Sequence, residues 1–356
     1  MNLVERLLAA RRDELRLDRL GLPANLSCVF VTPRFRTSRH VIALVTPAGS
    51  DEIRLVAKLP RRADDDGGLR REYANLSRLR DLWPEGRGSY PEAVLLEHVD
   101  RQPVLIETAL RGKALHHRAV RKDPQRAIAL VERWLDGLPV TGMSSHDGGW
   151  FDRTVAAPLR DFAGQAALGD EARRLVDRTL RIVGPLADAR FPFVFEHGDL
   201  THPNLLLTSG DRVGVVDWEL SQPQGLPVHD YCQFLAFVAF SLSRVHDLGG
   251  QVRAFESAFA GPRPWALPLI ARRLARLSID SRLLVPFVVA CWARYVAELL
   301  PRLVGSVPGA GGTADGGPAA LSDEAVALVR QDRDLALWRS AVRQADAMSA
   351  AVEASV

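Results

Sequence analysis

The residue types best suited to chemistry lie close together between positions 194 and 219. Asp199, Asn204 and Asp217 lie there in or beside a polar loop that is set between apolar runs. Carboxylate and amide oxygens are hard ligands that suit magnesium, and a carboxylate also accepts the proton of a hydroxyl group. Zinc is disfavoured because no cysteine lies nearby. Each residue alone is also compatible with a turn, a loop contact or a strand end, so only the set points to a magnesium ion and a hydroxyl group.

The flanking residues predict a β-hairpin that positions this set. Residues 205–207 and 213–216 are apolar runs with strand character, and residues 209–211 read Ser-Gly-Asp, a turn sequence. The two strands of a hairpin end together, so we expect four polar side chains at one end: His197, Asp199, Asn204 and Asp217. Of these, the carboxylates are the better bases because they stay ionised at neutral pH, and the histidine is expected to support the loop backbone.

Two motifs in this stretch resemble those of a known family. His-Gly-Asp-Leu-Thr-His-Pro-Asn at 197–204 and Val-Val-Asp-Trp-Glu at 215–219 resemble the catalytic loop and metal segment of the aminoglycoside phosphotransferase family, which is related to choline kinases and protein kinases. The resemblance implies a bilobal, protein-kinase-like α+β fold with an antiparallel-sheet N-lobe and a mainly helical C-lobe. It implies that Asp199 is catalytic and that Asn204 and Asp217 hold Mg²⁺ on the phosphates of ATP or GTP.

The N-terminal third has the pattern of such an N-lobe. Runs of Val, Ile and Leu predict an antiparallel sheet crossed by one helix at residues 69–82, and an amphipathic helix is expected at residues 3–20. The expected strands are residues 28–31, 40–46, 53–59, 94–99 and 104–108. We therefore predict an N-lobe at 1–108 on the nucleotide side and a C-lobe at 109–356, which carries the catalytic loop 197–204 and the metal segment 217–219.

Candidate nucleotide contacts follow from the resemblance. Lys58 lies near the end of the third predicted strand and Glu72 on the next helix. In related kinases this lysine contacts the phosphates and pairs with that glutamate. Taken alone, both residues are also typical of a charged surface. Residues 105–113 resemble the hinge between the lobes, where the adenine ring bonds to the backbone, and the register places these contacts near Glu107 and Ala109.

The expected phosphate loop departs from the family pattern. Kinases carry a glycine-rich turn between the first two strands, whereas residues 32–39 contain no glycine. Backbone amides approach phosphates most closely where glycine removes the Cβ atom. We hypothesise that Arg34, Arg36 or Arg39, together with Ser38, contacts phosphate through side chains instead. The alternative is that these are solvated hairpin residues.

The C-lobe is predicted to consist mainly of helices. Residues 139–150 form a polar loop that is either a lid or a connector, and Asp230 resembles a cap or an anchor for the catalytic-loop backbone. Residues 252–300 are expected to line the acceptor side. Helical patterns cover residues 124–138, 159–183, 231–242, 252–300 and 321–352, and residues 305–318 read as a flexible loop. The last helix is expected to dock on the body or on a second subunit.

Composition is that of an ordinary globular protein. The 356 residues are 47% hydrophobic and 25% charged, with a net charge of +3. The sequence has no basic stripe interleaved with aromatic residues, so it gives no support for a nucleic-acid-binding protein. Residues 283–300 are apolar but contain Pro286, Arg294 and Glu298, which indicates a core helix rather than a membrane span. Three widely spaced cysteines and no evident signal peptide favour the cytoplasm. A monomer or a homodimer is expected.

The combined pattern predicts a small-molecule kinase that transfers the terminal phosphoryl group of ATP or GTP to a substrate hydroxyl, in antibiotic modification or secondary metabolism. Arginine-rich C-terminal helices favour a neutral or anionic acceptor, although solvated arginine faces would look the same. The missing glycines favour an alternative, a catalytically silent nucleotide-binding or regulatory module. A metal-dependent hydrolase using His197, Asp199, His202 and Asp217 lacks a further matching ligand motif.

Overall fold

The computed structural model describes residues 1–32, 40–62, 65–145, 149–305 and 322–354. The chain forms two compact units. The sheet unit comprises Met1–His116, Ala129–Pro139 and His202–Gln222, and the helical unit comprises His117–Ile128, Val140–Thr201 and Pro223–Val356. The division falls inside the predicted catalytic loop, between Thr201 and His202, so each end of that loop is described with its own unit. The lobe boundary after residue 108 stays a prediction.

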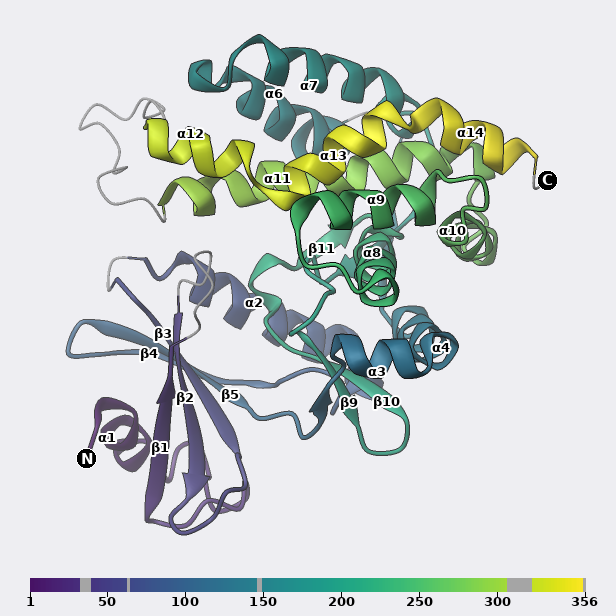
Figure 1. Ribbon diagram of the computed structural model, residues 1–356. Helices are drawn as coiled ribbons and strands as arrows, with labels where there is room; N and C mark the ends of the chain where they lie inside the picture. The colour runs from purple at the N-terminus through teal and green to yellow at the C-terminus, as the bar shows by residue number, and fades with distance from the viewer. Residues whose placement is uncertain (33–39, 63–64, 146–148, 306–321, 355–356) are drawn as a thin grey trace. The chain divides into compact units, whose positions relative to one another are not determined.

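The sheet unit is built on a five-stranded antiparallel sheet, which confirms the sheet predicted from the N-terminal sequence (Figure 1). Its order is β1-β2-β3-β5-β4. The strands are β1 (Leu26–Val31), β2 (His40–Pro47), β3 (Leu55–Pro60), β4 (Ala93–Val99) and β5 (Gln102–Thr108), and the predicted helix is α2 (Gly67–Leu82). Glu107 of β5 lies opposite Val56 of β3, two residues before Lys58. Lys58 and Glu107 therefore share one face of the sheet.

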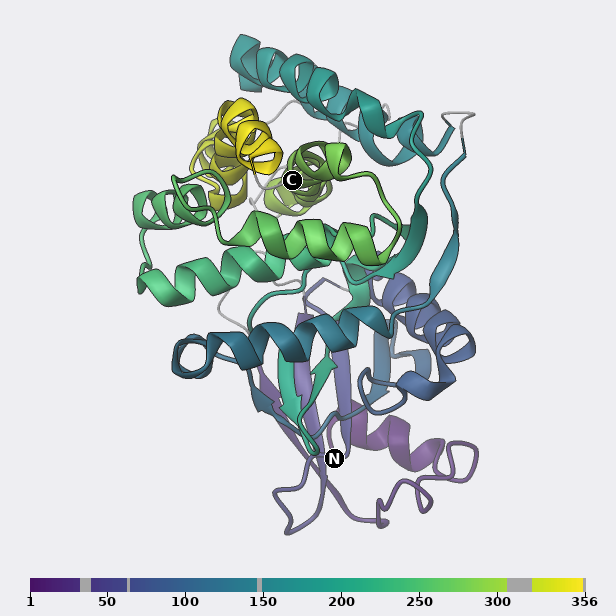
Figure 2. The same ribbon diagram turned by 90° about the vertical axis from the view of Figure 1, so that its right-hand side faces the viewer.

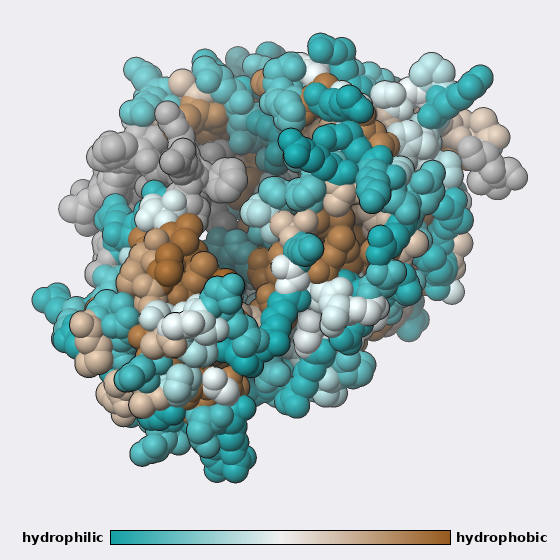
Figure 3. All heavy atoms as spheres, turned by 60° about the horizontal axis from the view of Figure 1, so that its bottom comes forward, coloured by the Kyte–Doolittle hydropathy of each residue, from teal (hydrophilic) through white to brown (hydrophobic). Residues whose placement is uncertain are grey.

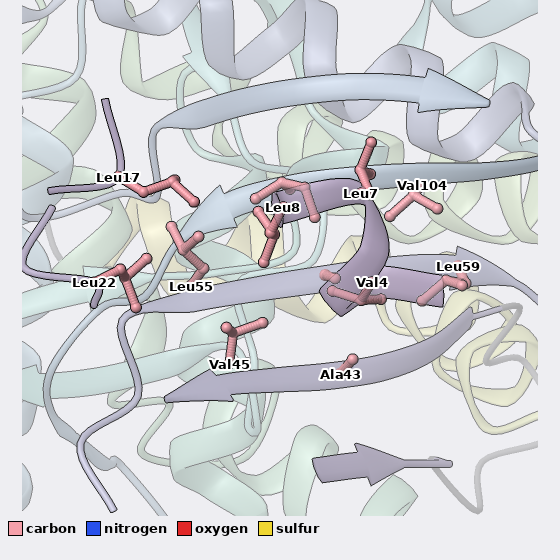
Figure 4. Packing of buried hydrophobic residues seen from close by; sticks show 12 residues of the cluster. Val4, Leu7, Leu8, Leu17, Leu22, Ala43, Val45, Leu55, Leu59 and Val104 are labelled. Atoms are coloured by element: carbon pink, nitrogen blue, oxygen red, sulfur yellow. The ribbon is translucent and has the colours of Figure 1, made fainter. Parts of the chain in front are cut away.

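The N-terminal helix α1 (Leu3–Ala10) packs on this sheet through its apolar face. Figure 4 shows Val4, Leu7 and Leu8 of α1 among apolar side chains of β2, β3 and β5. Burial of such aliphatic side chains contributes roughly 1.5–3 kcal/mol each relative to exposure. The apolar spacing that predicted an amphipathic helix here therefore marks a real core face.

The predicted end of this helix at Leu20 is wrong. The helix ends at Ala10, and residues 11–21 form a series of turns. Arg16 has a φ of 48°, in the left-handed region that a right-handed helix cannot include. The turns still bring Leu17 and Leu22 into the same core as α1. Hydrophobic spacing thus identified buried residues correctly but not the path of the backbone between them.

The predicted hairpin is present in the sheet unit. β9 (Leu205–Thr208) pairs antiparallel with β10 (Arg212–Val215), and β6 (Lys113–Ala114) adds to the other edge of β9. The turn uses positive φ angles at Gly210 (72°) and Asp211 (54°), residue types that tolerate this conformation. The turn chemistry read from Ser-Gly-Asp is therefore confirmed.

The helical unit surrounds one long apolar helix, α11 (Leu284–Gly305), which packs against α6, α7, α8 and α13. Figure 2 shows these helices from a second side, with the C-terminal α13 and α14 in yellow. The other helices of this unit are α3 (His117–Lys122), α5 (Gly149–Phe151), α6 (Ala157–Gly164), α7 (Gly169–Val183), α8 (His229–Ser243), α9 (Leu248–Phe259), α10 (Ala266–Arg276), α12 (Asp323–Arg330), α13 (Arg333–Arg343) and α14 (Ala345–Glu353). Helix α4 (Pro124–Asp136) is divided between the units, with its first five residues in the helical unit and the rest in the sheet unit. A small sheet has the order β11-β8-β7, formed by β7 (Val140–Met143), β8 (Pro192–Glu196) and β11 (Gln222–Gly225).

Three helical-unit predictions need correction. The segment 159–183 is not continuous, because α6 ends at Gly164 before the extended Gln165, and α7 begins only at Gly169, which has a φ of 74°. The segment 321–352 contains three helices, since Ser322 caps α12 and Asp332 caps α13 with side-chain oxygens. The predicted loop 139–150 begins with a strand, β7, that pairs with β8. Caps and long-range strand partners interrupted a pattern that looked periodic.

In the described part of the chain, one helical stretch, Ser281–Leu300, is long and apolar enough to cross a membrane, and 89% of its apolar window is buried inside the protein. That burial agrees with the predicted core helix. On the face visible in Figure 3, hydrophilic residues predominate and hydrophobic ones form separate patches. The predicted flexible loop 305–318 lies almost wholly outside the described residues, apart from Gly305 at the end of α11.

Candidate functional site

The hairpin brings Asn204 and Asp217 to the same end. Asn204 directly precedes β9 and Asp217 follows β10 by two positions, and the Val216 N–H donates to the Asn204 carbonyl over 3.0 Å. Asp217 has φ 71° and ψ 65°, in the left-handed region that aspartate tolerates better than most residues. The metal segment therefore turns sharply at the residue predicted to hold the metal.

Lys58 lies at the centre of a group of carboxylates within the sheet unit. Its Nζ atom is 2.5 Å from Glu72 Oε1, 3.2 Å from Asp217 Oδ1 and 3.7 Å from Glu107 Oε1. The ion pair predicted between β3 and α2 is thus present, and the same ammonium reaches the metal segment. Only 7% of the Lys58 side chain is exposed, so these contacts are made largely away from solvent.

The charged groups around Lys58 shift one another's pKa values. Burial disfavours the ammonium of Lys58, but Glu107, Glu72 and Asp217 together raise its pKa well above the usual range. Burial, followed by the charge of Glu107, raises the pKa of Glu72 well above its ordinary value. Burial likewise raises the pKa of Glu107. One lysine therefore stays charged while two buried carboxyl groups compete for a proton.

Glu107 was predicted to contact the nucleotide through its backbone, but the structure also gives its side chain a place in the site. The sequence suggested backbone atoms near Glu107 and Ala109, whereas the structure places the Glu107 side chain beside Lys58 with 2% of the residue exposed. The Ala109 N–H donates to the Arg54 carbonyl over 2.9 Å. Nucleotide contacts at these two residues stay a prediction. A glutamate directly after the apolar run Val-Leu-Ile was the available signal for a buried functional carboxylate.

The raised pKa of Glu107 predicts that the stability of the protein depends on pH. Because the folded protein binds the Glu107 proton more tightly than the unfolded chain, the stabilisation is present below the ordinary value of 4.5 and is lost as pH rises through the folded pKa. We expect Glu107→Gln, which cannot ionise, to lose less Tm than wild type as pH rises above the ordinary value of 4.5. Thermal unfolding of both proteins measures this, with the exposed Glu85→Gln as control. Parallel Tm profiles for wild type and Glu107→Gln would contradict it.

Helix α2 also anchors the residues that follow Asp217. Glu72 Oε1 accepts a hydrogen bond from the Trp218 N–H at 2.8 Å, and Asn75 Nδ2 donates to the Ser221 carbonyl at 2.9 Å. Gly68 lies close to the buried Glu219, since a Cβ atom at Gly68 would come within 2.9 Å of Glu219 Oε2. The helix that carries the partner of Lys58 thus also fixes the metal segment. Asn75 and Gly68 carry no sequence signal that would have identified these contacts.

In the helical unit, the backbone around Asp199 is held by α8. Asp230 accepts hydrogen bonds from the N–H groups of His197 and Gly198, both at 2.8 Å, so it anchors the loop backbone as its sequence position suggested. Gln233 accepts from the Leu200 N–H at 2.9 Å and donates to the Gly198 carbonyl at 3.1 Å. These two side chains hold the backbone of three loop residues, His197, Gly198 and Leu200.

Asp199 itself is hydrogen-bonded to His197, Thr201 and Tyr295. Its N–H donates to His197 Nδ1 at 3.2 Å, which is the backbone-supporting role expected for this histidine. Its Oδ1 atom accepts from the hydroxyls of Thr201, at 3.2 Å, and Tyr295, at 3.1 Å. Tyr295 lies on α11, and nothing in the sequence near the loop pointed to it. The carboxylate is thus held in one orientation by groups from two parts of the chain.

A buried ion pair lies directly before the loop. Arg294 Nη1 donates to Glu196 Oε2 at 2.9 Å, and His229 Nε2 lies 3.9 Å from Glu196 Oε1. Burial lowers the pKa of His229 to about 4, so this histidine is neutral at physiological pH. Burial, followed by the charge of Glu196, raises the pKa of Asp230 to about 7. The loop therefore begins on a charged core that contains no solvent-exposed member.

The predicted site residues fall into two sets. Lys58, Glu72, Glu107, Asn204 and Asp217 belong to the sheet unit, and Asp199 belongs to the helical unit. The chain joins the two sets directly, because only five positions separate Asp199 from Asn204. The predicted phosphate contacts Arg34, Arg36, Ser38 and Arg39 lie outside the described residues.

The donor set at the hairpin end fits magnesium. Mg²⁺ is commonly bound by one or two carboxylates together with substrate phosphates and water. Asp217 supplies a carboxylate and Asn204 an amide oxygen at the same hairpin end. Among the described residues, no group of three or more His, Cys, Asp or Glu side chains is arranged as a metal site.

Comparison with solved structures places the fold in the kinase-like class. An aminoglycoside phosphotransferase APH(4)-Ia mutant, solved with AMP-PNP and hygromycin B, is 16% identical, with coverage of 93% of this chain and 98% of that chain and a TM-score of 0.51. Choline kinase LicA from Streptococcus pneumoniae is 12% identical, with coverage of 93% and 99% and a TM-score of 0.50. Ethanolamine kinase from Plasmodium vivax is 13% identical, with coverage of 88% and 82% and a TM-score of 0.50.

The family follows from the sequence. The profile of the phosphotransferase enzyme family matches residues 36–267, which is more than half of the chain. The protein therefore belongs to this family of small-molecule kinases, and the resemblance to aminoglycoside phosphotransferases is confirmed. No curated protein sequence matches the chain.

Proposed function

We propose that the protein transfers the terminal phosphoryl group of ATP or GTP to the hydroxyl group of a small molecule. The observation that carries the proposal is the position of Lys58, which contacts Glu72 and Asp217 within the sheet unit. A lysine fixed between the α2 glutamate and the metal segment is the arrangement that phosphate binding in kinases requires. The family match and the firmly held Asp199 support the same function.

In this reaction Asp199 accepts the proton of the acceptor hydroxyl as that oxygen attacks the terminal phosphorus, and the bond to the leaving nucleoside diphosphate breaks. Lys58 offers a fixed positive charge to the donor phosphates, and Glu72 keeps it oriented. Asn204 and Asp217 would hold Mg²⁺, which when bound neutralises phosphate charge. Such a loose transition state demands mainly alignment and charge neutralisation, and these residues are of the types that supply both.

The acceptor is proposed to be a neutral or anionic alcohol, in antibiotic modification or secondary metabolism. The arginine-rich C-terminal helices support a neutral or anionic acceptor less strongly than the sequence suggested, because two of their arginines have structural roles. Arg273 donates to the Pro227 carbonyl and Arg294 to Glu196, and both are 1% exposed. A cytoplasmic location is also proposed. It is supported by three cysteines without disulfides.

A product assay tests this function. The purified chain is incubated with ATP or GTP, with and without Mg²⁺, and with hydroxylated antibiotics, sugars, nucleosides and amino alcohols. We expect Mg²⁺-dependent release of ADP or GDP and one acceptor that gains a phosphoryl group by mass spectrometry. Nucleotide binding without transfer to any acceptor would favour the catalytically silent alternative, and absence of nucleotide binding would end the kinase proposal.

A further inference from the structure

One oxygen of Asp199 accepts two hydroxyl hydrogen bonds. Thr201 belongs to the same loop, but Tyr295 lies on α11, 96 residues further along the chain. Tyr295 also lies beyond residues 36–267, the part matched by the family profile. A contact to the predicted base is therefore made by a part of this chain that the family match does not include.

The structure fixes Tyr295 as a hydrogen-bond donor. The residue is 7% exposed, and the preceding Arg294 anchors this turn of α11 through its ion pair with Glu196. Burial, followed by the charge of Asp199, raises the pKa of Tyr295 well above its ordinary value. The phenol consequently keeps its proton throughout the pH range in which a carboxylate acts as a base. Its proton is available to Asp199 Oδ1 over 3.1 Å.

A positive charge from a third element acts on the same pair. Arg333, at the start of α13, binds both oxygens of Asp334 through Nε at 2.9 Å and Nη2 at 3.1 Å. Asp334 chiefly raises the pKa of Arg333, and Tyr295 and Asp199 add to this effect. The groups that act on Asp199 therefore include His197 and Thr201 from its own loop, Tyr295 from α11, and Arg333 with Asp334 from α13.

We propose that Tyr295 is a positioning residue for Asp199: its hydroxyl holds Oδ1, together with Thr201, and so fixes the orientation in which the carboxylate meets the acceptor hydroxyl. This proposal rests on the proposed kinase function. A base must lie within hydrogen-bond reach of the proton that it removes, so a fixed rotamer contributes directly to the rate. C-terminal helices would then do more than line an acceptor site, because they set the orientation of the reactive group.

Tyr295→Phe removes only the hydroxyl and tests the proposal. We expect kcat to fall about 10-fold or more, because a hydrogen bond to a charged group is lost, while the KM for the nucleotide stays unchanged. The acid limb of the kcat/KM profile is expected to move to higher pH, since the carboxylate loses a donor that stabilises its charged form. In an Asp199→Asn background the same substitution should have no further effect on the rate.

Tyr90→Phe is the matched control. It removes the hydrogen bond from Tyr90 to the Trp83 carbonyl in the sheet unit, and it should change neither kcat nor the pH profile. Unchanged kcat and an unmoved acid limb in Tyr295→Phe would overturn the proposal while leaving the kinase function intact. If wild type transfers no phosphoryl group, the kinase function fails.

A measurement that does not depend on catalysis tests the positioning role separately from the kinase function. The carboxyl carbon of Asp199 is titrated by NMR in the full chain, with Asp199→Asn providing its assignment. We expect the titration of this carboxyl to move to higher pH in Tyr295→Phe and to stay in place in Tyr90→Phe. Identical titrations in wild type and Tyr295→Phe would overturn the positioning role even if no acceptor has been found.

Discussion

Asp199→Asn is expected to lower kcat for phosphoryl transfer by about 10³-fold, the typical contribution of a general base. Asparagine keeps the size of the side chain and can still accept the hydroxyl contacts from Thr201 and Tyr295 at its oxygen. It cannot take the proton of the acceptor hydroxyl, because an amide is not a base at neutral pH. The loss therefore falls on the chemical step rather than on the fold.

Steady-state kinetics with the acceptor found by the product assay measures this effect. The KM for the nucleotide is expected to stay within about twofold of wild type, since the substitution acts on the transition state. Asp161→Asn is the matched control, because Asp161 is an exposed aspartate of α6 in the same helical unit. A kcat for Asp199→Asn within tenfold of wild type would assign the base to another residue.

Arg294→Met is expected to reduce the free energy of unfolding by about 3–5 kcal/mol, as observed when one partner of a buried ion pair is removed. Glu196 is 0% exposed and also accepts the Leu226 N–H at 2.7 Å, so the loss of the guanidinium leaves a carboxylate without its cation. The neutral His229 does not supply the missing charge at physiological pH, because burial lowers its pKa to about 4. Glu196 directly precedes the catalytic loop, so activity is expected to decline as well.

Urea unfolding monitored by circular dichroism tests the size of this effect. The double variant Glu196→Gln/Arg294→Met removes both charges and should recover much of the lost stability. Arg272→Met, on an exposed position of α10, is the control for loss of a positive charge alone. A single variant as stable as the control would show that the ion pair does not hold this part of the helical unit together.

The helix predictions show what a local apolar pattern can and cannot predict. The expected helix at 3–20 stops at Ala10, yet Leu17 and Leu22 are buried with it as an apolar pattern requires. The expected helix at 159–183 is interrupted before Gly169, which adopts a φ of 74°. Apolar spacing reports which residues face a core, because burial is selected by hydrophobicity. It does not report the backbone angle of one residue, which the surrounding packing fixes.

The sequence by itself determined the family, the five-stranded sheet and the hairpin that joins Asn204 to Asp217, because their signals are local: alternation, turn residues and motif spacing. It also paired Lys58 with Glu72 through the family resemblance. Only the tertiary structure decided that Glu107 shares the surroundings of Lys58 and that Arg294 neutralises Glu196 beneath the loop. It alone brought Tyr295 to Asp199 from 96 residues away. Such contacts join side chains that are distant in sequence, so no local period or motif encodes them, and packing of the helices brings them together.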